Sequence, residues 1–448
     1  MNLTKNFSED GNFILSIEID KKIVTTANGL ITFENADLHH IETIEEYRNN
    51  GYAKLILNEL ITELEIRKIK NLFLEVNVNN INAIKLYKNA LFEQISIRKK
   101  YYNDTFDALI MRKKINEVIL AVESSCDETS VSIMENGKII SNVVSSQIDI
   151  HKLYGGVVPE IASRNHIFNC LDCFKEALTV AQKETSDIDY VAVTNGPGLI
   201  GSLLVGITAA NAFAYANKIP LIPINHLIGH IYATFLEHKI DFPLVALLVS
   251  GGHTELIYME SHYKFKLIGK TLDDAVGEAY DKVAKVLNLP YPGGPEIDKL
   301  SLTGSDIYHF PRVMLEKDSF NFSFSGLKSS VINLIRKFET NSTPFKKEDI
   351  ARSFQESVVE VLVKKTVKCA ELFNTKNIIV SGGVACNKRL REAMRSLDEY
   401  NVFIPSPKFC TDNAAMIASA CFYMRDKLSR TIKDNIITPF TNGEETYI

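Results

Sequence analysis

Three buried strands of this 448-residue chain each run directly into a group of glycines, and this pattern restricts the possible fold more than any other feature. The junctions are Val191–Gly198, Leu247–Gly252 and Ile378–Gly383. Long helical segments alternate with these apolar strands, which is typical of α/β domains. Glycines after a strand let a phosphate or nucleotide approach the backbone closely. The sequence therefore predicts a duplicated α/β architecture with a ligand in its central cleft.

A smaller α/β unit is predicted ahead of these junctions, because strand and helix patterns alternate there over a short span. Its expected elements are a strand over 13–19, a helix over 53–69, a strand over 71–76 and a helix over 81–88. A basic, turn-like stretch at Arg112–Asn116 leads into the buried strand Val118–Val122, which opens the second domain. The predicted domains are therefore 1–115 and 116–448.

Composition limits the compartment and the general surface character. The formal net charge of -5 gives no overall basic field of the kind that marks a nucleic-acid binder. Seven scattered cysteines and the lack of a signal-peptide pattern at Met1–Lys5 favour a reducing, cytoplasmic location. The one close pair, Cys170 and Cys173, is interpreted as a reduced helical pair rather than a redox motif or half a zinc site. No apolar run reaches the roughly 20 residues of a membrane span.

Two histidines and one distant aspartate are the candidate metal ligands. His226 and His230 stand four residues apart, which places both imidazoles on one face of a helix. Asp412 could complete a facial site with open coordination positions, as catalytic metals require. Taken alone, the histidine spacing is weak and favours ordinary surface or core histidines, but the surrounding glycine-rich segments favour the metal site instead.

Two further segments resemble nucleotide cradles. Leu248–Thr254 and Ser381–Asn387 each place a serine and two glycines after a buried strand, which exposes backbone N–H groups to an anion. A tight strand-to-helix turn is the alternative for either one, but the additional glycine pair in Tyr291–Asp298 favours nucleotide binding. Asp281 and Asp298 could hold ribose or base groups, or could be helix-surface carboxylates.

From about Glu117 onward, a series of motifs resembles the TsaD family, formerly called Gcp, which forms threonylcarbamoyladenosine in tRNA. The family belongs to the actin and Hsp70-like (ASKHA) superfamily, so the resemblance implies two such α/β subdomains. The matching stretches are Ala121–Thr129, His151–Arg164, Pro197–Gly206, Asn225–His230, Asp273–Asp281 and Phe322–Lys328.

The resemblance also implies ligands and partners. His226, His230 and Asp412 would bind one metal ion, iron or alternatively zinc. The adenylate contacts would come from Leu248, Val249, Ser250, Gly251, Gly252, Asp281, Gly294, Asp298 and Asn387. The donor would be threonylcarbamoyl-AMP and the acceptor the N6 amine of the adenosine 3′ of the anticodon in tRNAs for codons that begin with A. The implied partners are TsaB and TsaE, with a TsaC-type enzyme upstream.

Such a transfer needs a metal to polarise the carbonyl, glycine turns to hold the AMP leaving group, and a splayed-out base. Glu123 and Asp127 are tentative proton acceptors, or they simply order their turn. A metalloprotease is disfavoured, because Leu227 stands where an HExxH motif has glutamate. An ATP-dependent scaffold in the manner of Hsp70 is the other alternative, and it leaves the histidines without a role.

Basic residues follow Asn387 on a predicted helix and could contact tRNA phosphates. They are Lys388, Arg389, Arg391 and Arg395. A solvated helix face is the alternative explanation.

The first domain resembles the GNAT acetyltransferases, in particular the RimI group that acetylates ribosomal-protein N-termini. The resemblance spans about Phe13 to Ile115 and rests on Arg48–Ala53, Leu74–Asn80, Ala83–Tyr87 and Arg98–Tyr102. It implies acetyl-CoA contacts at Arg48, Gly51, Ala53 and Asn80, with Glu75 as general base and Tyr87 as general acid.

Two departures weaken the expectation of acetyltransfer. The chain begins about where the second strand of the family lies, so the first helices, which shape the acceptor groove, are missing. Leu91 replaces the usual glycine before Phe92, at a position suited to a left-handed helix end. A degenerate docking or CoA-binding module is therefore the alternative.

Overall fold

The computed structural model describes residues 1–102, 105–315, 319–428 and 437–441. The chain divides into two compact units, Met1–Glu117 and Val118–Ile448. Each unit buries its own clusters of apolar side chains.

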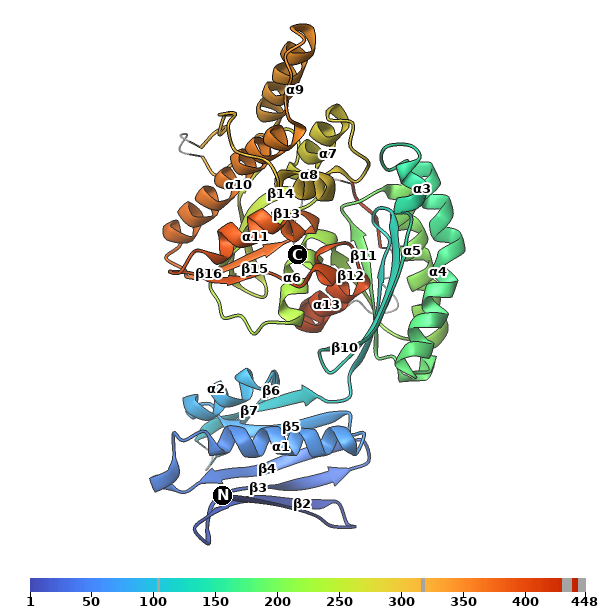
Figure 1. Cartoon of the computed structure of the whole chain (residues 1–448). Helices are drawn as coiled ribbons and strands as arrows, with labels where there is room; N and C mark the ends of the chain where they lie inside the picture. Colours follow the sequence, from blue (N-terminus) through green and yellow to red (C-terminus); the bar gives the residue numbers. More distant parts are fainter. Residues whose placement is uncertain (103–104, 316–318, 429–436, 442–448) are drawn as a thin grey trace. The chain divides into compact units, whose positions relative to one another are not determined.

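The first unit is a seven-stranded sheet in the order β1-β2-β3-β4-β5-β7-β6. Its elements are β1 (Asn2–Phe7), β2 (Asn12–Ile19), β3 (Lys22–Thr32), β4 (Asn35–Thr43), α1 (Tyr52–Ile66), β5 (Asn71–Asn77), α2 (Ile81–Asn89), β6 (Glu93–Tyr102) and β7 (Phe106–Lys114). All neighbouring strands are antiparallel except β4 and β5. Helix α1 lies against the sheet through Ile56, Leu57 and Leu60 (Figure 1).

The predicted elements of this unit are confirmed, with one end corrected. Helix α1 stops at Ile66 instead of residue 69, because Lys68 takes a left-handed φ of 57°. The Ile69 N–H then donates to the Leu64 carbonyl, and Ile69 turns back into the core. Strand β1 precedes the expected first strand and joins β2 through the turn at Ser8–Gly11, without intervening helices.

The second unit contains two five-stranded sheets of the same topology, β10-β9-β8-β11-β12 and β15-β14-β13-β16-β17. Counted along the chain, the first three strands of each sheet pair antiparallel with one another. The remaining two strands run parallel to the first one, which is β8 or β13. This repetition confirms the predicted duplication and is the ASKHA arrangement. Each half contributes the carboxyl ends of its parallel strands to the region where such folds bind ligands.

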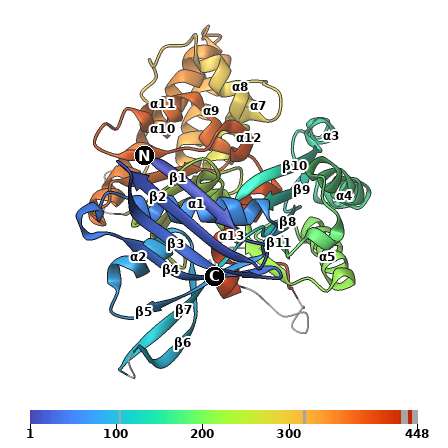
Figure 2. The ribbon, with the colours of Figure 1, turned by 90° about the horizontal axis from the view of Figure 1, so that it is seen from below.

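The first half contains β8 (Val118–Glu123), β9 (Glu128–Glu135), β10 (Lys138–Ser146), α3 (Ile148–Lys152), α4 (Pro159–Ala181), β11 (Tyr190–Gly196), α5 (Ile200–Asn217), β12 (Leu221–Asn225) and α6 (His226–Ala233). Helices α4 and α5 lie side by side on one face of its sheet (Figures 1 and 2). Helix α13 (Ala414–Leu428), from the end of the chain, packs on β8 and β9 and against α6.

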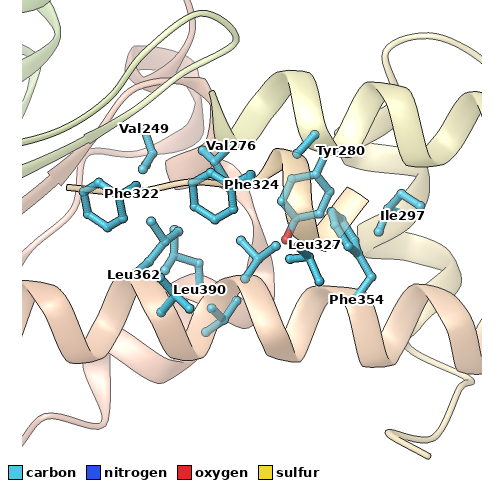
Figure 3. Close-up of a cluster of buried hydrophobic side chains, with 14 of the residues drawn as sticks. Val249, Val276, Tyr280, Ile297, Phe322, Phe324, Leu327, Phe354, Leu362 and Leu390 are labelled. Atoms are coloured by element: carbon cyan, nitrogen blue, oxygen red, sulfur yellow. The ribbon is translucent and has the colours of Figure 1, made fainter. Parts of the chain in front are cut away.

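The second half contains β13 (Leu244–Val249), β14 (Thr254–Ser261), β15 (Lys264–Lys270), α7 (Val276–Val286), α8 (Gly293–Ser301), α9 (Ser325–Thr340), α10 (Lys347–Leu372), β16 (Asn377–Ser381), the short 3-10 helix η4 (Gly383–Cys386), α11 (Lys388–Arg395), β17 (Asn401–Phe403) and α12 (Pro407–Cys410). Figure 3 shows Tyr280, Phe324, Leu327 and Phe354 converging among these helices. The buried cluster fixes α7 against α10.

Helix α5 bears on the expectation of no membrane span. Among the described residues it is the one helix with the length and apolar composition of such a span, at a mean hydropathy of 1.2 over 18 residues. Its Leu203 and Ala210 are buried in the cluster that α4 and β11 share. A core helix of an α/β domain has this same composition.

The aromatic cluster around His262 gives the unit a pH-dependent stability. Burial lowers the pKa of His262 to about 4, and its Nδ1 lies 2.8 Å from the Tyr232 hydroxyl. The folded state therefore keeps His262 neutral, while the unfolded chain takes up a proton below about pH 6.5. We expect the free energy of unfolding to fall by up to about 3 kcal/mol between pH 6.5 and pH 4. Denaturant titrations should show a smaller fall for His262→Phe, because phenylalanine does not titrate, while the Tyr232 hydroxyl still donates to the backbone carbonyl of residue 262.

Candidate active site

The two candidate histidines lie on α6, which the sequence starts sharply. The Asn225 side chain accepts hydrogen bonds from the N–H groups of Leu227 and Ile228, at 2.8 and 3.3 Å, and so caps the helix. His226 and His230 therefore occupy successive turns of a wholly buried helix. Asp412 reaches them from the segment between α12 and α13.

The three side chains form one cluster. The Nε2 atoms of His226 and His230 lie 3.6 and 3.1 Å from Oδ1 of Asp412, and one ligand atom from each residue falls within 4.8 Å of the others. His230 is 1% exposed, and apart from the Asp412 carboxylate neither of its ring nitrogens has a polar partner among the residues that the structure describes. Buried imidazole nitrogens without hydrogen-bond partners are what a metal ion would satisfy, so the donor set fits a divalent metal.

Glu123 orients the first histidine. Its buried carboxylate lies 3.1 Å from His226 Nδ1 and also accepts hydrogen bonds from the Ser125 backbone N–H and the Thr194 hydroxyl. With Nδ1 facing a carboxylate, Nε2 is left to face Asp412 and a metal. Burial alone would lower the pKa of His226, but the Asp412 and Glu123 carboxylates raise it to about 9.

Removing the charge of Glu123, while keeping the shape of its side chain, should therefore weaken metal binding. We expect Glu123→Gln to lower metal affinity about 10- to 100-fold, the usual effect of an altered partner behind a ligating histidine. Metal content after dialysis against graded chelator concentrations would measure this. An unchanged affinity would contradict the orienting role.

Asp127 and Glu128 extend the acidic turn beside this cluster. Burial, together with the Asp412 and Asp127 carboxylates, raises the pKa of Glu128 to about 10. The Glu128 carboxyl therefore keeps its proton to a higher pH than an ordinary glutamate and can hydrogen-bond Asp127. The turn can hold a proton close to the cluster, whereas Glu123 is fully buried and committed to three hydrogen bonds.

A cavity of about 500 Å³ lies in the second unit beside the cluster. Its lining residues are Ile148, Gly251, Gly277, Tyr280, Asp281, Tyr291, Pro292, Gly294, Pro295, Asp298, Lys299, Gly383, Val384, Cys386, Asn387, Lys388 and Thr411. Thr411 precedes Asp412. Burial and the nearby Asp127 and Asp281 carboxylates raise the pKa of Tyr291, which thus stands between the acidic turn and the cavity. Cavity and metal-ligand cluster are therefore neighbouring parts of one site.

Two carboxylates, those of Asp281 and Asp298, are among the residues that line the cavity. Asp281 accepts a hydrogen bond from the Gly293 N–H at 2.7 Å, which ties α7 to the start of α8. Asp298 accepts one from the Lys388 N–H through Oδ2, while its buried Oδ1 makes no hydrogen bond to a described residue. The bond to Lys388 ties α8 to the start of α11.

Asn387 is held by a buried amide. Its Oδ1 caps α11 by accepting from the Leu390 N–H, and its Nδ2 donates to Gln355 Oε1 at 2.7 Å. Gln355 also donates to the Ser301 hydroxyl, so these two hydrogen bonds connect α8, α10 and the start of α11. These fixed bonds give Asn387 one orientation toward the cavity.

The glycine turns occupy different places around this cavity. Gly251, Gly294, Asp281, Asp298 and Asn387 line it, whereas Leu248 and Val249 are fully buried on β13. Ser250 hydrogen-bonds His253 within its own turn, and Gly252 is exposed. At the matching turn Gly382 is needed for a φ of +92° and because a Cβ there would lie 2.3 Å from the Val249 carbonyl oxygen.

Some of the basic side chains of α11 already make hydrogen bonds or ion pairs within the protein. Arg391 donates to the carbonyls of Ala385 and Pro405, and Arg389 pairs with Glu356 at 2.7 Å. Lys388 lines the cavity. The predicted phosphate-contacting row is thus divided, because two of its guanidinium groups secure neighbouring segments.

The first unit has its own cavity of about 550 Å³. Strands β4 and β5 pair only as far as Leu38 and Leu74, although each continues several residues further, and the cavity lies where they part. Glu75 lines it and lies 2.8 Å from Arg98. The full lining is Asp37, Leu38, His39, Phe73, Leu74, Glu75, Arg98, Tyr101, Tyr102 and Ile110.

None of the other candidate residues of this unit is in the lining of that cavity. Burial raises the pKa of Tyr87 to about 12, so its hydroxyl stays protonated. Asn80 caps α2 by accepting from the Ala83 N–H. Gly51, with φ +82°, starts α1 without a side-chain cap, and Ala53 follows in the first turn, which leaves an open helix N-terminus for an anion. Arg48 donates to the Thr43 carbonyl.

Leu91 has the predicted left-handed conformation, with a φ of 63°. The Phe92 N–H donates back to the Tyr87 carbonyl, so α2 ends in a Schellman motif. We expect Leu91→Gly to be more stable than Leu91→Ala by about 1 kcal/mol, because both lose the same side chain but only glycine relieves the strain. Thermal unfolding of the two variants would test this, and equal stability would contradict it.

Several residues of the site were not predicted from the sequence. Ser125 and Thr194 bind Glu123, Glu128 shares the acidic turn, and Cys386 lines the cavity. Glu128 was within reach of prediction, since it follows Asp127 in the motif Ala121–Thr129. Cys386 also lies within the cradle segment Ser381–Asn387, whereas the bond of Thr194 to Glu123 depends on the pairing of β11 with β8, which spacing does not show.

The duplicated fold and its histidine–aspartate cluster define an ASKHA protein with side chains able to hold a metal ion. Its likeness to known proteins is more specific. A family model described as tRNA N6-adenosine threonylcarbamoyltransferase (TsaD) matches residues 138–419, and one described as Acetyltransferase (GNAT) family matches residues 2–91. The tRNA N6-adenosine threonylcarbamoyltransferase of Staphylococcus haemolyticus is 57% identical over 310 residues, which are 68% of this chain and 91% of that protein. That of Staphylococcus saprophyticus is 57% identical over 311 residues, with the same shares.

The chain belongs to the TsaD family of tRNA N6-adenosine threonylcarbamoyltransferases and carries a GNAT domain in front. It is therefore an enzyme that acts on tRNA. Among solved structures, the ribosomal-protein-S18-alanine N-acetyltransferase of Escherichia coli is 32% identical, covers 24% of this chain and 70% of its own, and has a TM-score of 0.23.

Proposed function

We propose that the second unit transfers the threonylcarbamoyl group from threonylcarbamoyl-AMP to N6 of the adenosine 3′ of the anticodon in tRNAs for codons that begin with A. The observation that carries this proposal is the adjacency of two sites. A cavity of about 500 Å³, lined by the carboxylates Asp281 and Asp298 among mostly apolar surface, also has Thr411 in its lining, and the next residue is Asp412 of the metal-ligand cluster. An adenylate in the cavity would thus present its acyl group to the cluster.

The chain divides the work between binding and proton handling. Asp281 and Asp298 would accept hydrogen bonds from ribose hydroxyls, and the Gly251 and Gly294 backbones would lie against the nucleotide. A metal held by His226, His230 and Asp412, iron or alternatively zinc, would supply Lewis-acid polarisation of the acyl carbonyl. Asp127 would take the proton from the attacking amine, beside the Glu128 carboxyl.

Partner proteins would dock on the exposed side of α4. Ile167, Phe168 and Leu171 are 60%, 75% and 66% exposed there, although they are large and apolar. We assign this surface to TsaB, with TsaE acting on the same complex and a TsaC-type enzyme supplying the adenylate. The reaction would take place in the cytoplasm.

Reconstitution tests the reaction against the scaffold alternative. Unmodified tRNA would be incubated with this protein, TsaB, TsaE, a TsaC-type enzyme, threonine, bicarbonate and ATP, and its nucleosides analysed by mass spectrometry. Threonylcarbamoyladenosine should appear only when the protein is present. ATP hydrolysis without modified nucleoside, from folded and metal-loaded protein, would favour the scaffold.

For the first unit we propose acetyl-CoA-dependent N-acetyltransfer, supported by the carboxylate of Glu75 at the cavity where β4 and β5 part. Glu75 would act as general base and Tyr87 as general acid, with the Arg48–Ala53 turn on the CoA phosphates. Calorimetry with acetyl-CoA, followed by thiol release in the presence of N-terminal peptides, separates enzyme from docking module. Binding without release would favour the docking module.

A further inference from the structure

The acidic turn between β8 and β9 is held in place through its backbone carbonyl groups. The Ser125 carbonyl accepts a hydrogen bond from the Leu199 N–H at 2.7 Å, and the Asp127 carbonyl accepts one from the Gln147 N–H at 3.1 Å. Leu199 precedes α5 and Gln147 precedes α3, so two separate segments secure the turn. Both donors are backbone groups, which a change of side chain leaves in place.

A buried histidine of α4 supplies the donor between these two. His166 is 0% exposed, and its Nε2 lies 2.9 Å from the Cys126 carbonyl oxygen, while its Nδ1 lies 2.7 Å from the Thr129 hydroxyl. A carbonyl oxygen can only accept, so Nε2 carries the proton and the Thr129 hydroxyl donates to Nδ1. Burial lowers the pKa of His166, which agrees with a neutral ring that donates on one side and accepts on the other.

The two hydrogen bonds of His166 bracket the acidic pair of the turn. Cys126 precedes Asp127, and Thr129 follows Glu128, so one rigid imidazole fixes the chain on both sides of the two carboxyl groups. Asp127 is itself 7% exposed. Loss of the imidazole would release the chain on both sides of Asp127, while the two bonds from backbone donors remain.

We propose that His166 is a positioning residue for the transfer reaction, which holds the Asp127 side chain in place through Cys126 and Thr129. Being fully buried, His166 acts on the substrate only through the turn. It belongs neither to the lining of the cavity nor to the metal-ligand cluster, so its loss should lower kcat and leave substrate and metal binding unchanged. This kinetic consequence rests on the proposed role of Asp127 as proton acceptor, but the hold of His166 on the turn does not.

Three variants of the full chain test the kinetic consequence in the reconstituted tRNA reaction. We expect His166→Leu to lower kcat on the order of 100-fold, the effect that a misplacement of about 1 Å can have. Thr129→Val keeps the shape of the side chain but removes one of the two bonds, and should lower kcat about tenfold. His166→Gln retains a donor and an acceptor and should stay within about fivefold of wild type. The KM for tRNA, the Kd for AMP and the metal content should keep their wild-type values in all three.

Amide hydrogen exchange of the full chain measures the hold on the turn without any catalysis. The Gln147 N–H, which donates to the turn, should exchange at least about tenfold faster in His166→Leu than in wild type. His262→Phe is the control, because it removes a histidine whose side-chain hydrogen bond, to Tyr232, lies outside the turn. This control should keep both the wild-type exchange at Gln147 and the wild-type kcat.

Each measurement has an outcome that contradicts one part of the proposal. Unchanged exchange at Gln147 in His166→Leu would overturn the hold on the turn. A wild-type kcat in that variant, or a fall in kcat matched by loss of metal, would overturn the positioning role. Faster exchange, in a protein whose wild-type form yields no threonylcarbamoyladenosine, would overturn the proposed function and still support the hold. If His166→Leu does not fold, Thr129→Val decides both questions by the same measurements.

Discussion

Replacing His226 with alanine is expected to lower the rate of tRNA threonylcarbamoylation at least about 100-fold. The change removes one of the three side chains proposed to hold the metal, and it leaves the buried carboxylate of Glu123 and the partly buried carboxylate of Asp412 without the imidazole between them. Loss of a metal that polarises the acyl carbonyl costs several kcal/mol of transition-state stabilisation, which corresponds to a fall of this size or greater. Nucleoside mass spectrometry over a time course would measure the rate.

Three measurements separate metal loss from misfolding. Asp412→Asn retains the shape of the side chain and should show a fall in both rate and metal content. His238→Ala removes a histidine outside the cluster, whose ring lies 5.7 Å from that of Phe403, and should keep wild-type activity. A wild-type rate from chelator-treated, metal-free protein would contradict the role assigned to the cluster.

Replacing Gly294 with leucine is expected to weaken AMP binding at least about 100-fold with little change in thermal stability. Gly294 lines the cavity, and a Cβ at this position would meet no other atom within 4 Å. Its backbone is not left-handed, so a side chain introduces no strain and instead enters the space of the ligand. A ligand that must share a filled pocket loses contact area and orientation together.

A graded pair of variants makes this prediction specific. Gly294→Ala should weaken AMP binding far less than Gly294→Leu, because it adds one methyl group to the open space. Calorimetry would give the two affinities, and thermal unfolding would show whether the fold is intact. Equal, wild-type affinities for both variants would place the adenylate elsewhere.

Periodicity and turn chemistry predicted much of the secondary structure. The strand Val118–Val122 was visible as a short apolar run, and β8 confirms it. The end of α1 was missed by three residues, because a left-handed lysine ended the helix where the apolar pattern continued. Local patterns report which residues can be helical, whereas a single backbone rotation decides where the helix stops.

For the candidate site, the sequence could supply the residues but not the contacts among them. Helical spacing was enough to place His226 and His230 on one face, and the glycine turns were evident after their strands. The assignment of Glu123 to His226, however, required β8 and α6 to meet across 103 residues of sequence separation. The same holds for the hydrogen bond that links Asn387 to Gln355 on α10.

Motifs and periodicity are local properties of the chain, so they were enough to predict the duplicated α/β class, the TsaD resemblance and the identity of the three metal-ligand candidates. Folding in three dimensions was needed to show that Glu123 orients a histidine and that two of the arginines of α11 are engaged internally. These facts depend on which segments the two sheets bring together, and packing fixes that choice through contacts between residues far apart in sequence.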